Sequence, residues 1–166
     1  TVPYLSTIDL AATGGSGDGR LIFSTSGDCR AVSGILIVGD AGSECLVRVD
    51  KLGDDNYVGQ VSVFQEITIT KLNQADLMIG NSTATTIRDI ELFTHGGSGT
   101  GSVSYAVDPD TNPALCQIID GNILRAGADG TCDVTATKAA STNYNVAPSA
   151  MKRFTFSKAK QNVVFT

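Results

Sequence analysis

The sequence predicts an all-β chain that folds as two small antiparallel β-sandwiches in tandem. Three observations predict this fold class: an internal repeat, period-two alternation of apolar and polar residues, and turn residues that recur roughly every 8 to 12 positions. No segment keeps helical periodicity over three turns, so a parallel α/β architecture with crossover helices is excluded. The 166 residues suffice for one ordinary domain or two small ones, and the repeat favours two.

The repeat is clearest in two glycine-rich segments, Gly14–Gly19 and Gly96–Gly101, whose first residues lie 82 positions apart. Beyond these segments the spacing lengthens to 87 positions, so five residues are inserted in the second copy. The insertion falls in the segment Asp108–Leu115, which is rich in residues typical of surface loops. Residues paired at the longer spacing include Cys29 with Cys116, Cys45 with Cys132 and Gln74 with Gln161.

The repeat divides the chain into three segments. Residues 1–73 are predicted to form a first unit without its first strand, and residues 74–160 a second, complete unit. Residues 161–166 then begin a following unit or add a C-terminal strand. Because a unit of roughly 80 residues buries a core of its own, we expect two separate domains with a short linker near residues 72–74, in a longer natural array.

Alternation predicts seven strands in the second unit and assigns their faces. The strands are residues 76–79, 86–94, 102–107, 116–119, 123–126, 131–137 and 151–157. The side chains expected to face the cores are Ile90, Leu92, Thr94, Cys132, Val134, Ala136, Phe154 and Phe156, and in the first unit Ile8, Leu10, Ala12, Cys45, Val47, Val49, Ile67 and Ile69.

The four cysteines predict one disulfide within each unit. Fifteen residues separate Cys29 from Cys45, and fifteen separate Cys116 from Cys132. Pairing within units is the only connectivity that respects the repeat without crossing between units. A zinc site is disfavoured because C-x2-C pairs are missing and the chain has one His. Disulfides predict an oxidising location, either secreted or at the cell surface.

Composition excludes several classes of function. With 12 Lys and Arg against 17 Asp and Glu, the net charge of -5 provides no footprint for nucleic acid. No apolar run approaches the roughly 20 residues that span a bilayer, so we expect no membrane insertion. The glycine-rich segments lack the Gly-Lys-Ser/Thr ending of a phosphate loop, and the single His lacks a nucleophilic partner. We therefore expect neither catalysis nor a cofactor.

Several segments resemble the tandem bacterial immunoglobulin-like repeats, of the Big type, found in large secreted surface proteins and adhesins. The segments that carry the resemblance are Gly96–Tyr105, Gly121–Ala126, Gly130–Tyr144 and Phe154–Gln161. They cover nearly all of the second unit, whereas the first diverges at Gly42–Lys51 but keeps its cysteine spacing and Asn56–Tyr57. The resemblance implies immunoglobulin-like sandwiches that serve as spacers in cell adhesion, with neighbouring repeats as their partners.

The inserted segment contains a weak candidate for calcium. The spacing of Asp108, Asp110 and Asn112 resembles the start of a calcium loop. However, Pro113 and Ile119 stand where an EF-hand requires a glycine and a carboxylate. A solvated turn is therefore the simpler interpretation.

Two alternatives to a spacer remain open at this level. The inserted loop of the second unit is suited to contact a glycan or a host or matrix protein, since loops on rigid sandwiches commonly bind ligands. Alternatively, residues 161–166 add as a strand to the incomplete first unit of another molecule, which would give head-to-tail self-association.

Overall fold

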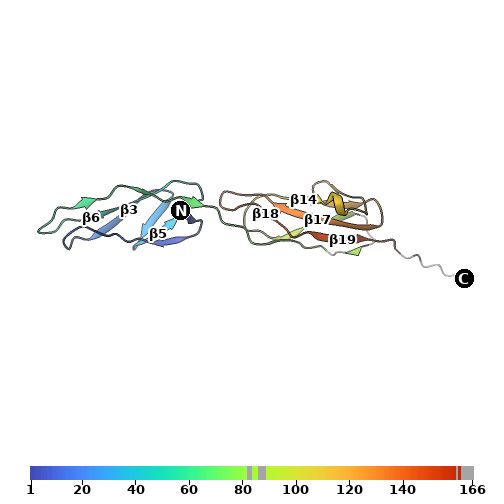
Figure 1. The fold of residues 1–166 in the computed structure, drawn as a ribbon, viewed down its shortest axis with the longest axis horizontal. Helices are drawn as coiled ribbons and strands as arrows, with labels where there is room; N and C mark the ends of the chain where they lie inside the picture. The colour runs from blue at the N-terminus through green and yellow to red at the C-terminus, as the bar shows by residue number, and fades with distance from the viewer. Residues whose placement is uncertain (82–83, 86–88, 160, 162–166) are drawn as a thin grey trace. The chain divides into compact units, whose positions relative to one another are not determined.

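The computed structural model describes residues 1–81, 84–85, 89–159 and 161, and this part of the chain is all-β (Figure 1). Its only helical element among these residues is a single 3-10 turn. The chain divides into two compact units, Thr1–Leu72 (unit 1) and Asn73–Thr166 (unit 2). No helix of sufficient length and apolarity to cross a membrane occurs in the described ranges.

Unit 1 has nine described strands arranged in mostly antiparallel sheets. Strands β2, β5 and β4 form one sheet, while β3 pairs with β6, and β7 and β8 also pair with β6. The short strands β1 and β9 pair in parallel. The strands are β1 (Val2–Pro3), β2 (Thr7–Asp9), β3 (Leu21–Gly27), β4 (Cys29–Val32), β5 (Ile35–Val38), β6 (Cys45–Lys51), β7 (Gln60–Val61), β8 (Gln65–Glu66) and β9 (Ile69–Thr70).

Unit 2 repeats this arrangement with one more strand. Strands β12, β16 and β15 form a three-stranded sheet, and β19, β17 and β14 form a larger one that β11 and β18 extend. Strands β10 and β13, which pair antiparallel, both lack a counterpart among the strands of unit 1. The elements are β10 (Leu77–Ile79), β11 (Ala84–Thr85), β12 (Asp89–Glu91), β13 (Thr94–Gly96), β14 (Val103–Val107), η1 (Pro109–Thr111), β15 (Cys116–Ile119), β16 (Ile123–Ala126), β17 (Gly130–Lys138), β18 (Ala147–Pro148) and β19 (Lys152–Phe156).

The strand pairs that involve β6 in unit 1 and β17 in unit 2 correspond residue by residue. Tyr105 lies opposite Ala136 in the β14–β17 pair, and Phe23 lies opposite Val49 in the β3–β6 pair. These positions are related by the spacings of 82 and 87 that the sequence repeat shows. The parallel β11–β19 pair of unit 2 lies at the place of the β1–β9 pair of unit 1, with a register that differs by one residue. The sequence repeat is therefore also a repeat of sheet pairing.

Each unit has its own apolar core between its sheets, consistent with a β-sandwich. In unit 2 the side chains of Leu124, Val134 and Phe154 are fully buried and come from both main sheets. Alternation correctly placed the β17 and β19 side chains in this core. The buried core residues of unit 1 are fewer, namely Leu36, Val38, Cys45, Val47 and Ile69.

Two predictions about strands and faces were wrong in detail. The strand predicted over residues 86–94 has β12 and β13 as two separate strands within its described part, while residues 86–88 lie outside the described residues. The chain changes partner between them: Asn81 accepts from the amide of Phe93 at 3.0 Å and donates to the carbonyl of Glu91 at 2.7 Å. In unit 1, Val49 is only half-buried and does not join the core cluster, whereas Ile67, also half-buried, packs against that cluster as predicted.

Candidate functional site

Each unit has one disulfide, which joins the two main sheets of that unit. Cys29 of β4 is bonded to Cys45 of β6, with Cα atoms 5.5 Å apart. Cys116 of β15 is bonded to Cys132 of β17, with Cα atoms 6.3 Å apart. Each bond therefore links the three-stranded sheet of its unit to the larger sheet, across the core. Such a cross-link resists separation of the sheets and restricts the unfolded chain.

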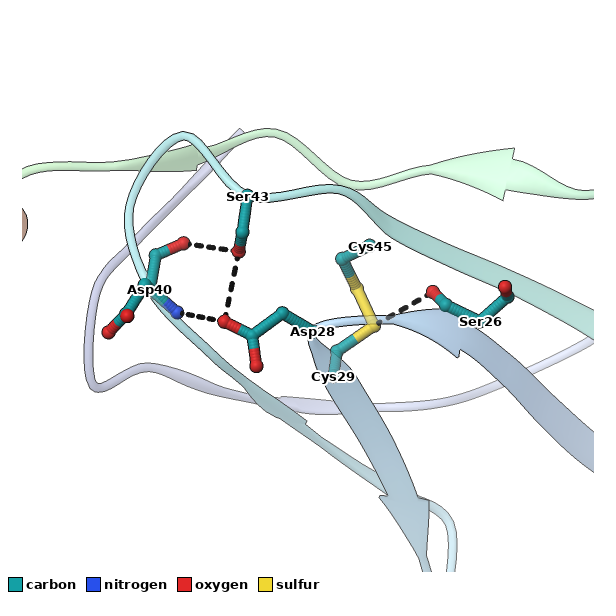
Figure 2. The surroundings of a disulfide bond; sticks show 6 residues. All are labelled: Ser26, Asp28, Cys29, Asp40, Ser43 and Cys45. Atoms are coloured by element: carbon teal, nitrogen blue, oxygen red, sulfur yellow. Dashed lines mark hydrogen bonds between the residues drawn. A yellow bond between two sulfur atoms is a disulfide. The ribbon is translucent and has the colours of Figure 1, made fainter.

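A polar cluster holds the loop beside the first disulfide (Figure 2). The Asp28 carboxylate accepts from the amide of Asp40 at 2.7 Å and from the Ser43 hydroxyl at 3.1 Å. The Ser43 hydroxyl also lies 2.6 Å from the carbonyl oxygen of Asp40. The loop between β5 and β6 is thereby fixed next to Cys29. The role of Asp28 was not predicted from the sequence, because its partners Asp40 and Ser43 lie 12 and 15 residues away and no local pattern connects them to it.

The calcium candidates are engaged in building the inserted loop. Asp108 caps the 3-10 turn, because its Oδ1 accepts from the amide of Asp110 at 2.9 Å. Asn112 Oδ1 accepts from the amide of Cys116 at 2.6 Å, and its Nδ2 donates to the Cys116 carbonyl at 3.0 Å. The loop is thus tied to the strand that carries the second disulfide. No cluster of three or more His, Cys, Asp or Glu suited to a metal occurs in the described part of the chain.

An ion pair of unit 2 between a buried carboxylate and an exposed guanidinium was not predicted from the sequence. The Asp133 side chain is 2 % exposed, and Arg153 contacts both its oxygens, at 2.8 and 2.6 Å. These hydrogen bonds hold the pKa of Asp133 below its ordinary value, against the opposing effect of burial. Asp133 alternates correctly with the core residues on either side of it, so period two places it on the opposite face. Arg153 of β19 covers Asp133 on that face, and the sequence alone does not identify β19 as the neighbouring strand.

Unit 1 has a different acidic turn near its glycine-rich segment. Asp54 accepts from the amides of Asp18 at 2.6 Å, Asn56 at 2.9 Å and Tyr57 at 3.0 Å. The amide of Asn56 above all keeps the pKa of Asp54 below its usual range. These bonds join two loops at one end of the unit, which is an architectural role.

No protein-family model matches the chain, and neither does any curated protein. The fold, the two disulfides and the repeat are therefore the features that bear on function. The features with the most specific geometry, namely the disulfides and their supporting loops, all connect parts of one unit to each other.

Proposed function

We propose that the chain is a pair of immunoglobulin-like spacer repeats from a large extracellular surface protein or adhesin of bacteria. In this role each unit is a link of a stalk, and the chain separates a distal functional domain from the cell surface. Catalysis and a bound cofactor have no part in the proposal.

The observation that carries the proposal is that the same disulfide-bonded unit occurs twice. Both units have equivalent strand registers, and both place a disulfide between equivalent strands. Repetition of a self-contained unit extends a chain without requiring a new core, which is the physical advantage of an array. The cross-links add resistance to unfolding, which favours a load-bearing role over a purely flexible linker.

The same bonds support the proposed extracellular location. Two disulfides are compatible with an extracellular protein, since thiols are kept reduced in the cytosol. The resemblance to Big-type repeats of secreted adhesins supports a place at a bacterial surface.

Small-angle scattering in non-reducing buffer tests the spacer proposal. A compact chain of this length has a radius of gyration of about 15 Å, whereas two separate units with centres about 40 Å apart give about 23 Å. We expect the larger value at the dilute limit, unchanged by calcium or by a chelator. A value near the compact one would contradict a stalk, because the units would then be packed side by side.

A further inference from the structure

The two disulfides differ in how far one of their cysteines is open to solvent. Cys45 of β6 and Cys132 of β17 are both fully buried. Their partners differ: Cys116 is 4 % exposed, whereas Cys29, at the equivalent position of unit 1, is only half-buried. Each bond therefore has one deeply buried end, and the bond of unit 1 has a second end that is partly open to solvent.

The inserted loop of unit 2 explains why Cys116 is buried. Ala114 lies in this loop, is fully buried and belongs to the same core cluster as Cys116 and Cys132. Its amide donates to the carbonyl of Thr131 at 3.1 Å, and its carbonyl accepts from the amide of Ala128 at 2.9 Å. Main-chain hydrogen bonds therefore hold the loop against the part of unit 2 that contains the disulfide.

Unit 1 has a cavity beside its disulfide in place of the inserted loop. Asp28 alone connects β3 to β4, so no loop residue is available at this point to cover Cys29. Cys29 borders a cavity of about 250 Å³, which is lined by Gly27–Arg30 and Ile37–Gly39. A space of this size admits a small molecule to the partly exposed end of the bond.

The charged side chains beside the cavity are arranged so that an anion can approach. Arg30 is exposed and lines the cavity, so it brings a positive charge close to Cys29. The Asp28 carboxylate is turned away from the two sulfur atoms, toward Asp40 and Ser43 (Figure 2). Its hydrogen bonds with the Asp40 amide and the Ser43 hydroxyl hold it there. The cavity therefore presents a positive charge to an attacking thiolate.

We propose that Cys29 is a site of thiol–disulfide exchange, at which small thiols open the disulfide of folded unit 1 while that of unit 2 stays closed. A thiolate attacks Cys29 Sγ and forms a mixed disulfide, and Cys45 Sγ leaves with the electron pair of the broken bond and takes up a proton. A second thiolate attacks the mixed disulfide and releases Cys29 as a thiol. Two small thiols are thereby oxidised to one disulfide, and the cystine gains two electrons and two protons.

Access to the attacked sulfur is the term that separates the two bonds. The rate of exchange depends on that access and on the leaving thiol. The leaving cysteines, Cys45 and Cys132, are equally buried, so they do not favour one bond over the other. Attack at Cys29 therefore makes the bond of unit 1 the more reactive. The proposal goes beyond the spacer role and does not depend on it.

Treatment of the full chain with reduced glutathione in native buffer tests the proposal. Acid quenching, alkylation and peptide mass spectrometry then follow each disulfide separately and locate the glutathione adduct. We expect the bond of unit 1 to open at least about tenfold faster than that of unit 2, with the adduct on Cys29. Equal rates, faster opening in unit 2, or an adduct mainly on Cys45 would each overturn the proposal.

The dependence of the rate on thiol and on urea shows whether unit 1 is folded when it reacts. Direct attack gives a rate that rises linearly with glutathione and changes little in dilute urea. If unit 1 had to unfold first, about 1 M urea would speed the reaction at least about fivefold, because urea favours the unfolded state. That result, or a rate that levels off at high glutathione, would overturn attack at an exposed site.

Two charge-reversal variants test whether the thiol enters through the cavity. Arg30→Glu changes the cavity wall, whereas Arg20→Glu makes the same change of charge at the far end of the seven-residue strand β3, about 20 Å away and beyond the range of screened charges. With glutathione, whose thiolate is anionic overall, R30E should lower the rate at least about threefold. With cysteamine, whose thiolate form is neutral overall, it should change the rate little. Equal effects of R30E and R20E on the glutathione reaction would contradict entry at this cavity.

Discussion

Units 1 and 2 are built on one plan but differ in how completely the core is closed. Phe154 of unit 2 is fully buried beneath its sheets, whereas Ile67, at the equivalent position, is half-buried. Ser149 is 9 % exposed, while Ser62 is exposed although it keeps the same backbone hydrogen bond. Unit 1, in which no described strand corresponds to β10, therefore keeps the paired strands and the disulfide, but its residues equivalent to Phe154 and Ser149 are more exposed.

The largest expected effect compares core truncations at equivalent positions. Phe154→Ala should destabilise unit 2 by about 3 to 5 kcal/mol, because a fully buried ring leaves a cavity. Ile67→Ala should cost unit 1 less than half as much, since that side chain is already partly in water. Denaturant titration followed by hydrogen exchange, which resolves the two units, measures both. Equal losses would show that Ile67 is as fully buried in solution as Phe154.

Removal of each disulfide should have the next largest effect. In the chain-entropy model a loop of this size contributes about 3 kcal/mol. Replacing both cysteines of a pair by alanine should therefore cost similar amounts in the two units, but unit 1, with its smaller core, should be the one that unfolds at ambient temperature. Near-ultraviolet circular dichroism and limited proteolysis would detect this difference. The comparison fails if unit 2 is cleaved first.

Acid should affect unit 2 through the ion pair between buried Asp133 and exposed Arg153. The pKa of Asp133 is lowered in the folded state, so its contribution to stability is present above the unfolded pKa, near 4, and is lost as pH falls through the folded value. Leu46 and Glu66 occupy the equivalent positions in unit 1, which has no such pair. Thermal unfolding in acid should therefore show a loss in unit 2 that Arg153→Gln reduces. An identical acid dependence in wild type and R153Q would contradict this assignment.

The smallest expected effect concerns the inserted loop that unit 1 lacks. Asn112→Ala removes both side-chain hydrogen bonds to the Cys116 backbone and should destabilise unit 2 by about 1 to 2 kcal/mol. Asp110→Ala, which removes an exposed carboxylate, serves as the control and should change stability little. If calcium raised the unfolding temperature in wild type and not in D110A, the loop would be a cation site in addition to a structural tie.

Much of the fold could be predicted from the sequence, because strands that are buried on one face show a clear alternation of apolar and polar residues. The alternation along Cys132, Val134 and Ala136 predicted the central strand of unit 2 and its buried face. The two-residue strands β11 and β18 were missed, since two residues cannot show a period. Their pairing depends on neighbours far away in the chain.

The polar contacts that support the loops and strands were harder to predict, because they too depend on which residues the fold brings together. Asp28, Asp133 and Asn112 each depend on a partner brought close by the fold or by a turn, so their residue type alone did not reveal their role. Asn112 was considered as an oxygen ligand, and the structure instead uses that oxygen to accept a backbone amide. Side chains of turn residues are ambiguous in this way because the same oxygen atoms serve caps and cations.

Force spectroscopy of single chains, pulled from both ends, tests most directly whether two separately folded, stapled units make up the chain. We predict two unfolding events in non-reducing buffer. Reduction should lengthen each by about 50 Å, because a sequence separation of 16 residues extends to about 56 Å at roughly 3.5 Å per residue, and the bonded Cα atoms already lie 5.5 and 6.3 Å apart. One cooperative event, or extensions that do not change on reduction, would contradict a chain of two separately folded units with one disulfide each.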